Sequence, residues 1–178
     1  MGSFYDEGPL RHAAINLFYG WGYNFYRQEN QLRADDQLVR AKVSWLLGRA
    51  RTAVERAESD WRREKLPAPS RAKPFPDPDA VAAAQALERL AHEIGLLKGR
   101  IETQPVPEND RMTQRHRQEA ATLQALGERD ALLVGQADLL RSLTEDHAAE
   151  AILAANLAEG LSAIAATLHD RQAILQGH

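Results

Sequence analysis

The sequence contains no cysteine, which excludes disulfide bonds, thiol catalysis and cysteine-based zinc sites. It has no apolar run close to the roughly 20 residues of a transmembrane helix. Its N-terminus also lacks the charged, apolar and small-residue order of a signal peptide. A net charge of −3 leaves no basic excess for general nucleic-acid binding. We therefore expect a cytoplasmic protein with no membrane span, and we do not expect nucleic acid as a partner.

Aromatic residues are missing from the last hundred or so positions, because all eleven lie before residue 76. Six of them fall within residues 18–26. Tryptophan and tyrosine in such a segment suit stacking on sugars or bases, packing over a neighbouring helix, or contact with a membrane surface. The later apolar content is Leu, Ile, Ala and Val, which is typical of a helical scaffold. Any unusual recognition surface is therefore expected near the front of the chain.

Apolar residues recur every three or four positions in four segments, as paired helices require. We predict helices over residues 24–65, 78–103, 110–143 and 145–176, after an aromatic N-terminal segment over 1–23. Asp77 and Pro78 form an N-cap followed by proline at the first helical position, and Thr144 is expected to cap the last helix. No segment alternates with period two for long enough to suggest a sheet. The sequence predicts one all-α domain over 1–178, an up-down bundle of three to four long helices.

The first predicted helix is longer than the others, at about 60 Å for a rise of 1.5 Å per residue. It should therefore extend beyond its neighbours at one end. Either the aromatic segment folds back over this overhang or a second subunit covers it. The second possibility, together with the paired-helix pattern, predicts a homodimer, and a different protein partner is also possible.

Two carboxylates fall on the apolar pattern of the overhang, since steps of seven back from Val43 reach Asp36 and then Glu29. Tyr26 and Arg33 share that face at spacings of three and four. Buried carboxylates are costly unless they are paired. One interpretation is a polar pocket walled by aromatic residues, serving as an acid–base pair, a metal site or a sugar or nucleotide cleft. The other is a Glu29–Arg33 surface pair or a contact across a dimer. The candidate binding residues are Trp21, Tyr23, Tyr26, Glu29, Arg33 and Asp36.

Other polar patterns favour structural roles. Asp130 and Arg171 occupy positions where the three- and four-residue spacing of their helices predicts apolar residues. A satisfied buried pair, or a wrong assignment of the apolar face, is a better interpretation there than a ligand contact. No Glu-x-x-His motif supports a di-iron centre, and no glycine-rich loop supports a bound nucleotide phosphate, so we expect no metal and no cofactor. The basic residues Lys42, Arg49, Arg56 and Arg63 repeat every seven positions. This basic stripe could meet phosphate or an acidic partner, but a solvated helix flank is the simpler interpretation.

The stretch Phe25-Tyr26-Arg27-Gln28-Glu29-Asn30-Gln31-Leu32-Arg33 resembles the signature of a bacterial family of unknown function, domain of unknown function forty-two fifty-four. That signature reads roughly Leu-Trp-His-x-Glu-Asp-x-Ala-Arg. Tyr26, Glu29 and Arg33 hold its Trp, Glu and Arg places, whereas Arg27 and Asn30 replace its His and Asp. The resemblance implies an all-helical fold. Because members are often encoded near glycosyltransferases, it also implies a link to cell-envelope glycan metabolism.

Two classes of function follow from these patterns. The first is a non-enzymatic accessory or scaffold protein that acts through protein–protein interaction. The alternative is a sugar- or nucleotide-binding protein or enzyme, with Glu29 or Asp36 as the base and Arg33 binding an anion. The sequence does not decide whether the protein is an enzyme, and no catalytic residue is assigned.

Overall fold

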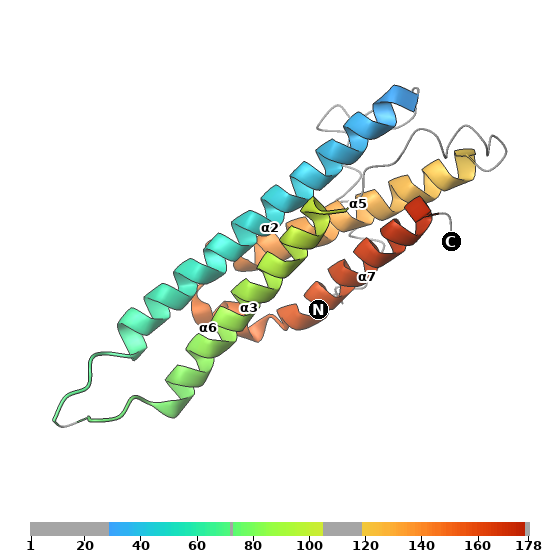
Figure 1. The fold of residues 1–178 in the computed structure, drawn as a ribbon. Helices are drawn as coiled ribbons and strands as arrows, with labels where there is room; N and C mark the ends of the chain where they lie inside the picture. The colour runs from blue at the N-terminus through green and yellow to red at the C-terminus, as the bar shows by residue number, and fades with distance from the viewer. Residues whose placement is uncertain (1–28, 72, 105–118, 177–178) are drawn as a thin grey trace.

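The computed structural model describes residues 29–71, 73–104 and 119–176, with side chains described for 37–71, 73–104 and 125–176. Within these ranges the chain forms five helices and no strand (Figure 1). The helices are α2 (Glu29–Lys65), α3 (Pro78–Glu102), α5 (Glu119–Thr144), α6 (Ala149–Ala154) and α7 (Leu157–Gln176). The predicted all-α fold built from long helices is confirmed.

The four long helices form a ring in the order α2, α3, α7, α5 (Figure 1). The helices α2 and α3 are antiparallel, since Ser44 contacts Glu102 at one end of the pair and Trp61 contacts Ala80 at the other. The helices α5 and α7 are also antiparallel neighbours, and α2 runs parallel to α5. Consecutive long helices alternate in direction, yet α3 and α5 lie diagonally across the ring.

The start of α3 is fixed by the predicted cap. The side chain of Asp77 accepts a hydrogen bond from the backbone N–H of Asp79 at 3.0 Å, and Pro78 occupies the first turn. Proline suits this position because its missing N–H would have no partner inside the helix. The indole Nε1 of Trp61 donates to the backbone oxygen of Ala80 at 2.9 Å, which ties the end of α2 to the first turn of α3.

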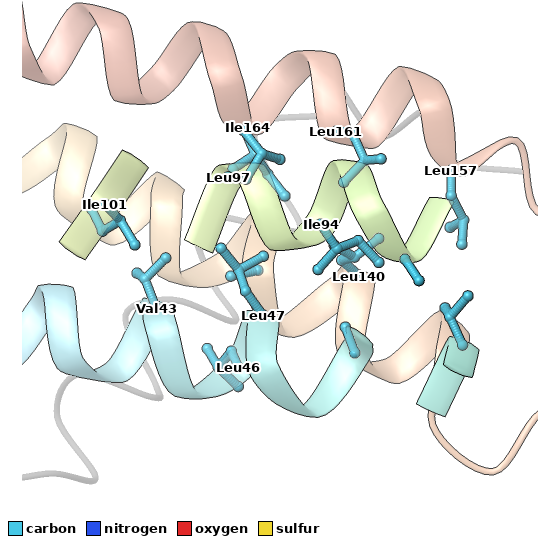
Figure 2. Packing of buried hydrophobic residues seen from close by; sticks show 14 of the residues in the cluster. Val43, Leu46, Leu47, Ile94, Leu97, Ile101, Leu140, Leu157, Leu161 and Ile164 are labelled. Atoms are coloured by element: carbon cyan, nitrogen blue, oxygen red, sulfur yellow. The ribbon is translucent and has the colours of Figure 1, made fainter. Parts of the chain in front are cut away.

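The core lies along the axis of the ring, where side chains from all the helices meet (Figure 2). Val43 and Leu47 of α2 are fully buried and pack in one cluster with Ile94 of α3, Leu140 of α5 and Ile164 of α7. Full burial of a side chain of this size stabilises a fold by about 1.5–3 kcal/mol. The apolar spacing of this helix predicts a seam of Leu32, Val39, Val43, Leu46, Ala50, Ala53 and Ala57. Five of these, Val39, Val43, Leu46, Ala50 and Ala57, are buried, Ala53 is half-buried, and the side chain of Leu32 lies outside the described part of the chain. Leu47 and Val54 are also buried, because the buried face of α2 is wider than a two-helix seam.

The predicted helix over 145–176 is not continuous: α6 begins only at Ala149, and residues 155 and 156 separate it from α7. Thr144 does not cap that helix; it ends α5, and its hydroxyl donates to the backbone oxygen of Leu140 at 3.0 Å. The turn that follows places Asp146 at φ 59°, and Asn156 at φ 48° separates α6 from α7. Both are left-handed conformations that asparagine and aspartate adopt more readily than other side chains.

Several predicted boundaries lie outside the described residues. These are the aromatic segment over 1–23, the start of the first helix at residue 24 and the start of the third at residue 110. The predicted overhang has a counterpart in the helix lengths, since α2 has 37 residues and α3 has 25. Among the helices described, none combines the length and apolarity that crossing a membrane requires.

Candidate functional site

The six residues predicted to form a binding site fall largely outside what the structure describes. Trp21, Tyr23 and Tyr26 precede the first described residue. Glu29, Arg33 and Asp36 belong to the opening turns of α2, but their side chains are outside the described part of the chain. Whether these residues converge on a pocket therefore stays a prediction.

A groove of about 1190 Å³ runs along the outer face of α2. Lys98 and Glu102 of α3 border it on one side, and the turn between α5 and α6 borders it on the other. Its floor is α2 itself, from Gln37 to Glu64. We call this surface the α2 groove.

An exposed tryptophan lies in the α2 groove. Trp45 is 51% exposed, on the side of α2 away from the buried core. Leu38 is 49% exposed one heptad earlier on the same face. The small residues Ala41, Gly48 and Thr52 complete a second series spaced by three and four residues, which we call the outer seam. Because such spacing is typical of helices that pack against another helix, α2 carries a packing pattern on its outer side as well as on its core side.

Cationic side chains flank the tryptophan. The Nζ of Lys42 lies 4.5 Å from the centre of the Trp45 ring, and the guanidinium carbon of Arg49 lies 5.7 Å from it. Burial lowers the pKa of the Lys42 amine from its ordinary value, and the charge of Asp138 acts in the opposite direction. Cation–π contacts of this kind contribute about 0.5–1 kcal/mol at exposed sites. They hold the indole ring in place beside the groove.

Ion pairs join the groove to α5 and tie up part of the predicted basic stripe. Arg49 pairs with Glu145 at the turn after α5, and Arg141 pairs with the same carboxylate. Farther along α2, Arg63 pairs with Asp60 at 2.7 Å. Stripe residues with acidic partners in their own chain present less net positive charge to a nucleic acid.

On the α3 side, one carboxylate collects two donors. Ser44 donates to the Oε1 of Glu102 at 2.6 Å, and the Nζ of Lys98 donates to the same oxygen at 2.5 Å. The hydrogen bond from Lys98, followed by the one from Ser44, lowers the pKa of the Glu102 carboxyl from its ordinary value. This cluster fixes one edge of the groove.

Gly48 lies in the middle of α2, where glycine costs about 1 kcal/mol relative to alanine. A Cβ built at this position would meet the Cε of Lys98 at 3.6 Å, which is an ordinary van der Waals contact with the end of a long side chain. The packing of the described residues therefore gives no reason for glycine here. A reason exists if another backbone or a large side chain approaches α2 at this point.

The predicted pair of Asp130 and Arg171 is present and satisfied. The Nε of Arg171 donates to the Oδ1 of Asp130 at 2.5 Å, and the side chains are 0% and 4% exposed. Arg171 also donates to the Oε1 of Gln104 at 3.0 Å, and Gln104 in turn donates to the backbone oxygen of Leu168 at 3.2 Å. The backbone oxygen of Gln104 accepts from Arg40 at 2.7 Å. This network binds α2, α5 and α7 to the end of α3, and a structural role explains its contacts.

The outer seam is the feature that sequence reasoning missed. Lys42 and Arg49 were singled out for their charge, while Trp45 between them was not. The signal was present as the series Leu38, Ala41, Trp45, Gly48 and Thr52. It was obscured because the apolar residues on the core face of the same helix recur with the same three- and four-residue spacing. In the part of the chain that the structure describes, no group of three or more His, Asp or Glu side chains is arranged to hold a metal ion.

Comparison with known proteins adds no relative: no family model matches the sequence, no curated protein matches it, and no solved structure matches it. The resemblance of residues 25–33 to the family of unknown function therefore stays a prediction.

Proposed function

We propose that this protein is a cytoplasmic, non-enzymatic accessory or scaffold protein that acts through protein–protein interaction, and that the α2 groove is its binding surface. The observation that carries the proposal is Trp45, half exposed on a helix face that repeats a packing pattern. Tryptophan is enriched among the residues that dominate binding energy at protein interfaces.

The dimensions of the groove favour a polypeptide partner. It follows α2 from Gln37 to Glu64, a length of about 40 Å at 1.5 Å per residue, which a partner helix can occupy and a single sugar or nucleotide cannot fill. Charged side chains at its edges are already paired, Arg49 with Glu145 and Lys98 with Glu102. A polar rim around an aromatic centre is the usual composition of a protein–protein interface.

A photo-cross-linking experiment tests the proposal in the cells that naturally make the protein. Benzoylphenylalanine is placed at Trp45 in one variant and at Phe75 in a control. Phe75 is 84% exposed in the connection before α3 and does not line the groove. We expect irradiation to join a second polypeptide to the chain at position 45 and none at position 75. Mass spectrometry then identifies the cross-linked chain.

The opposite outcome is as clear. If position 45 yields no polypeptide adduct, or no more than position 75, the α2 groove is not an interaction surface and the proposal fails. A sugar or nucleotide that raises the melting temperature of the wild-type protein, but not of a Glu29→Gln variant, would then favour the small-molecule alternative.

A further inference from the structure

We infer that the partner in the α2 groove is a second copy of this chain, and that the two α2 helices pack antiparallel about a two-fold axis beside residue 43. This inference rests on the proposed function and names its partner. A two-fold interface brings the same surface patch from both copies together, so that patch must be complementary to itself. The outer seam of α2 meets this requirement in its pairing of large with small residues, in the glycine that this pairing explains, and in the charge along the helix.

The first is shape. With the axis beside residue 43, Trp45 of one copy lies opposite Ala41 of the other, and Leu38 lies opposite Gly48. Each large side chain of the outer seam thus faces a small one, and the two-fold axis repeats both pairings. Large residues facing small ones let two helices interdigitate without voids. A register that brought Trp45 against its own counterpart would instead hold the helices apart.

The second is Gly48. This glycine weakens its own helix by about 1 kcal/mol, and the nearest described contact of an added Cβ is the Lys98 side chain at 3.6 Å. In the antiparallel pair, Leu38 of the second copy lies opposite this position. The absence of a side chain at Gly48 then has a purpose, since it provides the space for that leucine.

The third is charge along α2. Its opening turns, residues 29–36, carry Glu29, Asp35 and Asp36 against one arginine, whereas residues 50–57 carry Arg51 and Arg56 against Glu55. Antiparallel packing about residue 43 places residues 29–36 of each helix beside residues 50–57 of the other. Parallel packing would bring the two acidic opening turns together. Charge complementarity therefore favours one orientation as well as association itself.

Sedimentation of the full chain tests the association. We expect the wild-type protein to sediment at twice the 19.8 kDa of one chain over a wide range of concentration. Replacing Gly48 with leucine fills the space that the second copy needs. We expect this to weaken dimerisation by at least about 30-fold, the effect of removing one strong interface contact. The dissociated Gly48→Leu monomer should keep the helical circular dichroism signal of the wild-type protein.

Gly99 provides the matched control. It lies near the end of α3, does not line the groove, and a Cβ added there meets no described atom within 4 Å. A Gly99→Leu variant should remain dimeric. If both leucine variants dissociate to the same degree, the effect is not specific to the groove and the inference is wrong.

The orientation is tested with single cysteines, which a chain without cysteine accepts cleanly. L38C and G48C are prepared separately and oxidised alone or mixed. In the antiparallel pair, each position lies about 15 Å along the axis from its own counterpart, too far for a disulfide, which needs Cα atoms about 5.5 Å apart. We therefore expect a cross-linked dimer from the mixture and none from either variant alone.

The remaining outcomes each contradict part of the inference. A cross-link formed by L38C alone indicates parallel packing. A wild-type monomer at every concentration overturns the dimer. If Gly48→Leu then also lowers the melting temperature, the groove is filled from within the chain, with residues 1–28 the expected occupant. Photo-adducts at Trp45 to a different protein would keep the proposed function while refuting the second copy as the partner.

Discussion

Replacing Asp130 with alanine is expected to destabilise the bundle by about 3–5 kcal/mol, because it removes the carboxylate that pairs with the fully buried guanidinium of Arg171. The structure gives this penalty its basis. Both side chains are almost entirely removed from solvent, at 0% and 4% exposure, so water cannot replace the lost carboxylate. The hydrogen bond of Arg171 to Gln104, at 3.0 Å, satisfies a donor but supplies no negative charge.

The assay is equilibrium unfolding in urea, with thermal unfolding as a second measurement. A domain of this size loses about 2–4 °C of melting temperature per kcal/mol, so Asp130→Ala should melt about 6–20 °C lower than wild type. Asp60→Ala is the control, since it breaks an exposed pair with Arg63 whose side chains are 77% and 54% exposed for arginine and aspartate respectively. That change should cost at most about 1 kcal/mol.

A double substitution distinguishes the loss of one partner of the ion pair from the loss of both. Asp130→Leu combined with Arg171→Met removes both charges and keeps the volume apolar, which should leave stability unchanged or raise it by about 1–4 kcal/mol. The reasoning is refuted if Asp130→Ala costs no more than Asp60→Ala at an unchanged urea slope. It is also refuted if the double variant is as unstable as the single one.

Three further predictions concern single positions. Gly99→Ala should raise the free energy of unfolding by about 0.5–1 kcal/mol, because the added methyl group meets open space; urea unfolding that shows a loss would contradict this. Asn156→Val should lower stability by roughly 1–2 kcal/mol, since valine is strained in the left-handed conformation at φ 48°, whereas Asn156→Gly should be close to neutral in the same thermal assay. Ser44→Ala should raise the pKa of Glu102 towards its ordinary value, because one of its two donors is lost. The folded-state pKa of Glu102 is lowered, so its contribution to stability is present above the unfolded pKa and is lost as the pH falls through the folded one. The destabilisation by Ser44→Ala should therefore be seen at neutral pH and vanish in acid, and NMR titration showing an unchanged Glu102 pKa would argue against it.

Periodic features were predictable from the sequence, because helix burial follows directly from spacing. In α3, the apolar spacing indicates Ala80, Leu87, Ile94, Leu97 and Ile101 as core positions, and all five are buried. Ala83 and Leu90 at the same spacing are only half-buried, and Ala84 and Ala91 are buried in their place. The cap formed by Asp77 and Pro78 was also predictable, since each residue acts on the backbone beside it. The pairing of Asp130 with Arg171 was predictable as a type of interaction, because two opposite charges at apolar seam positions each require a partner.

Features that depend on a single backbone angle or on the ring order were not predictable. Asn156 ends one helix and begins another through one left-handed residue, and a single asparagine does not show from the sequence whether it adopts that conformation. The outer seam was missed because the exposure of Trp45 becomes informative only when the structure shows that the opposite face of α2 packs in the core. The candidate pocket around Glu29 and Asp36 stays a prediction, since it depends on residues that the structure does not describe.

The diagonal arrangement of α3 and α5 means that the chain consists of two helical hairpins laid side by side. Each hairpin, α2 with α3 and α5 with α7, joins antiparallel helices that are close in sequence, so each can assemble through local contacts before the two meet. Contacts between the hairpins run from α2 to α5 and from α3 to α7. These contacts close the longest loops of the chain and should form last. We therefore expect the docking of the two hairpins, with Gln104 bridging from the end of the first to Arg171 of the second, to set the folding rate.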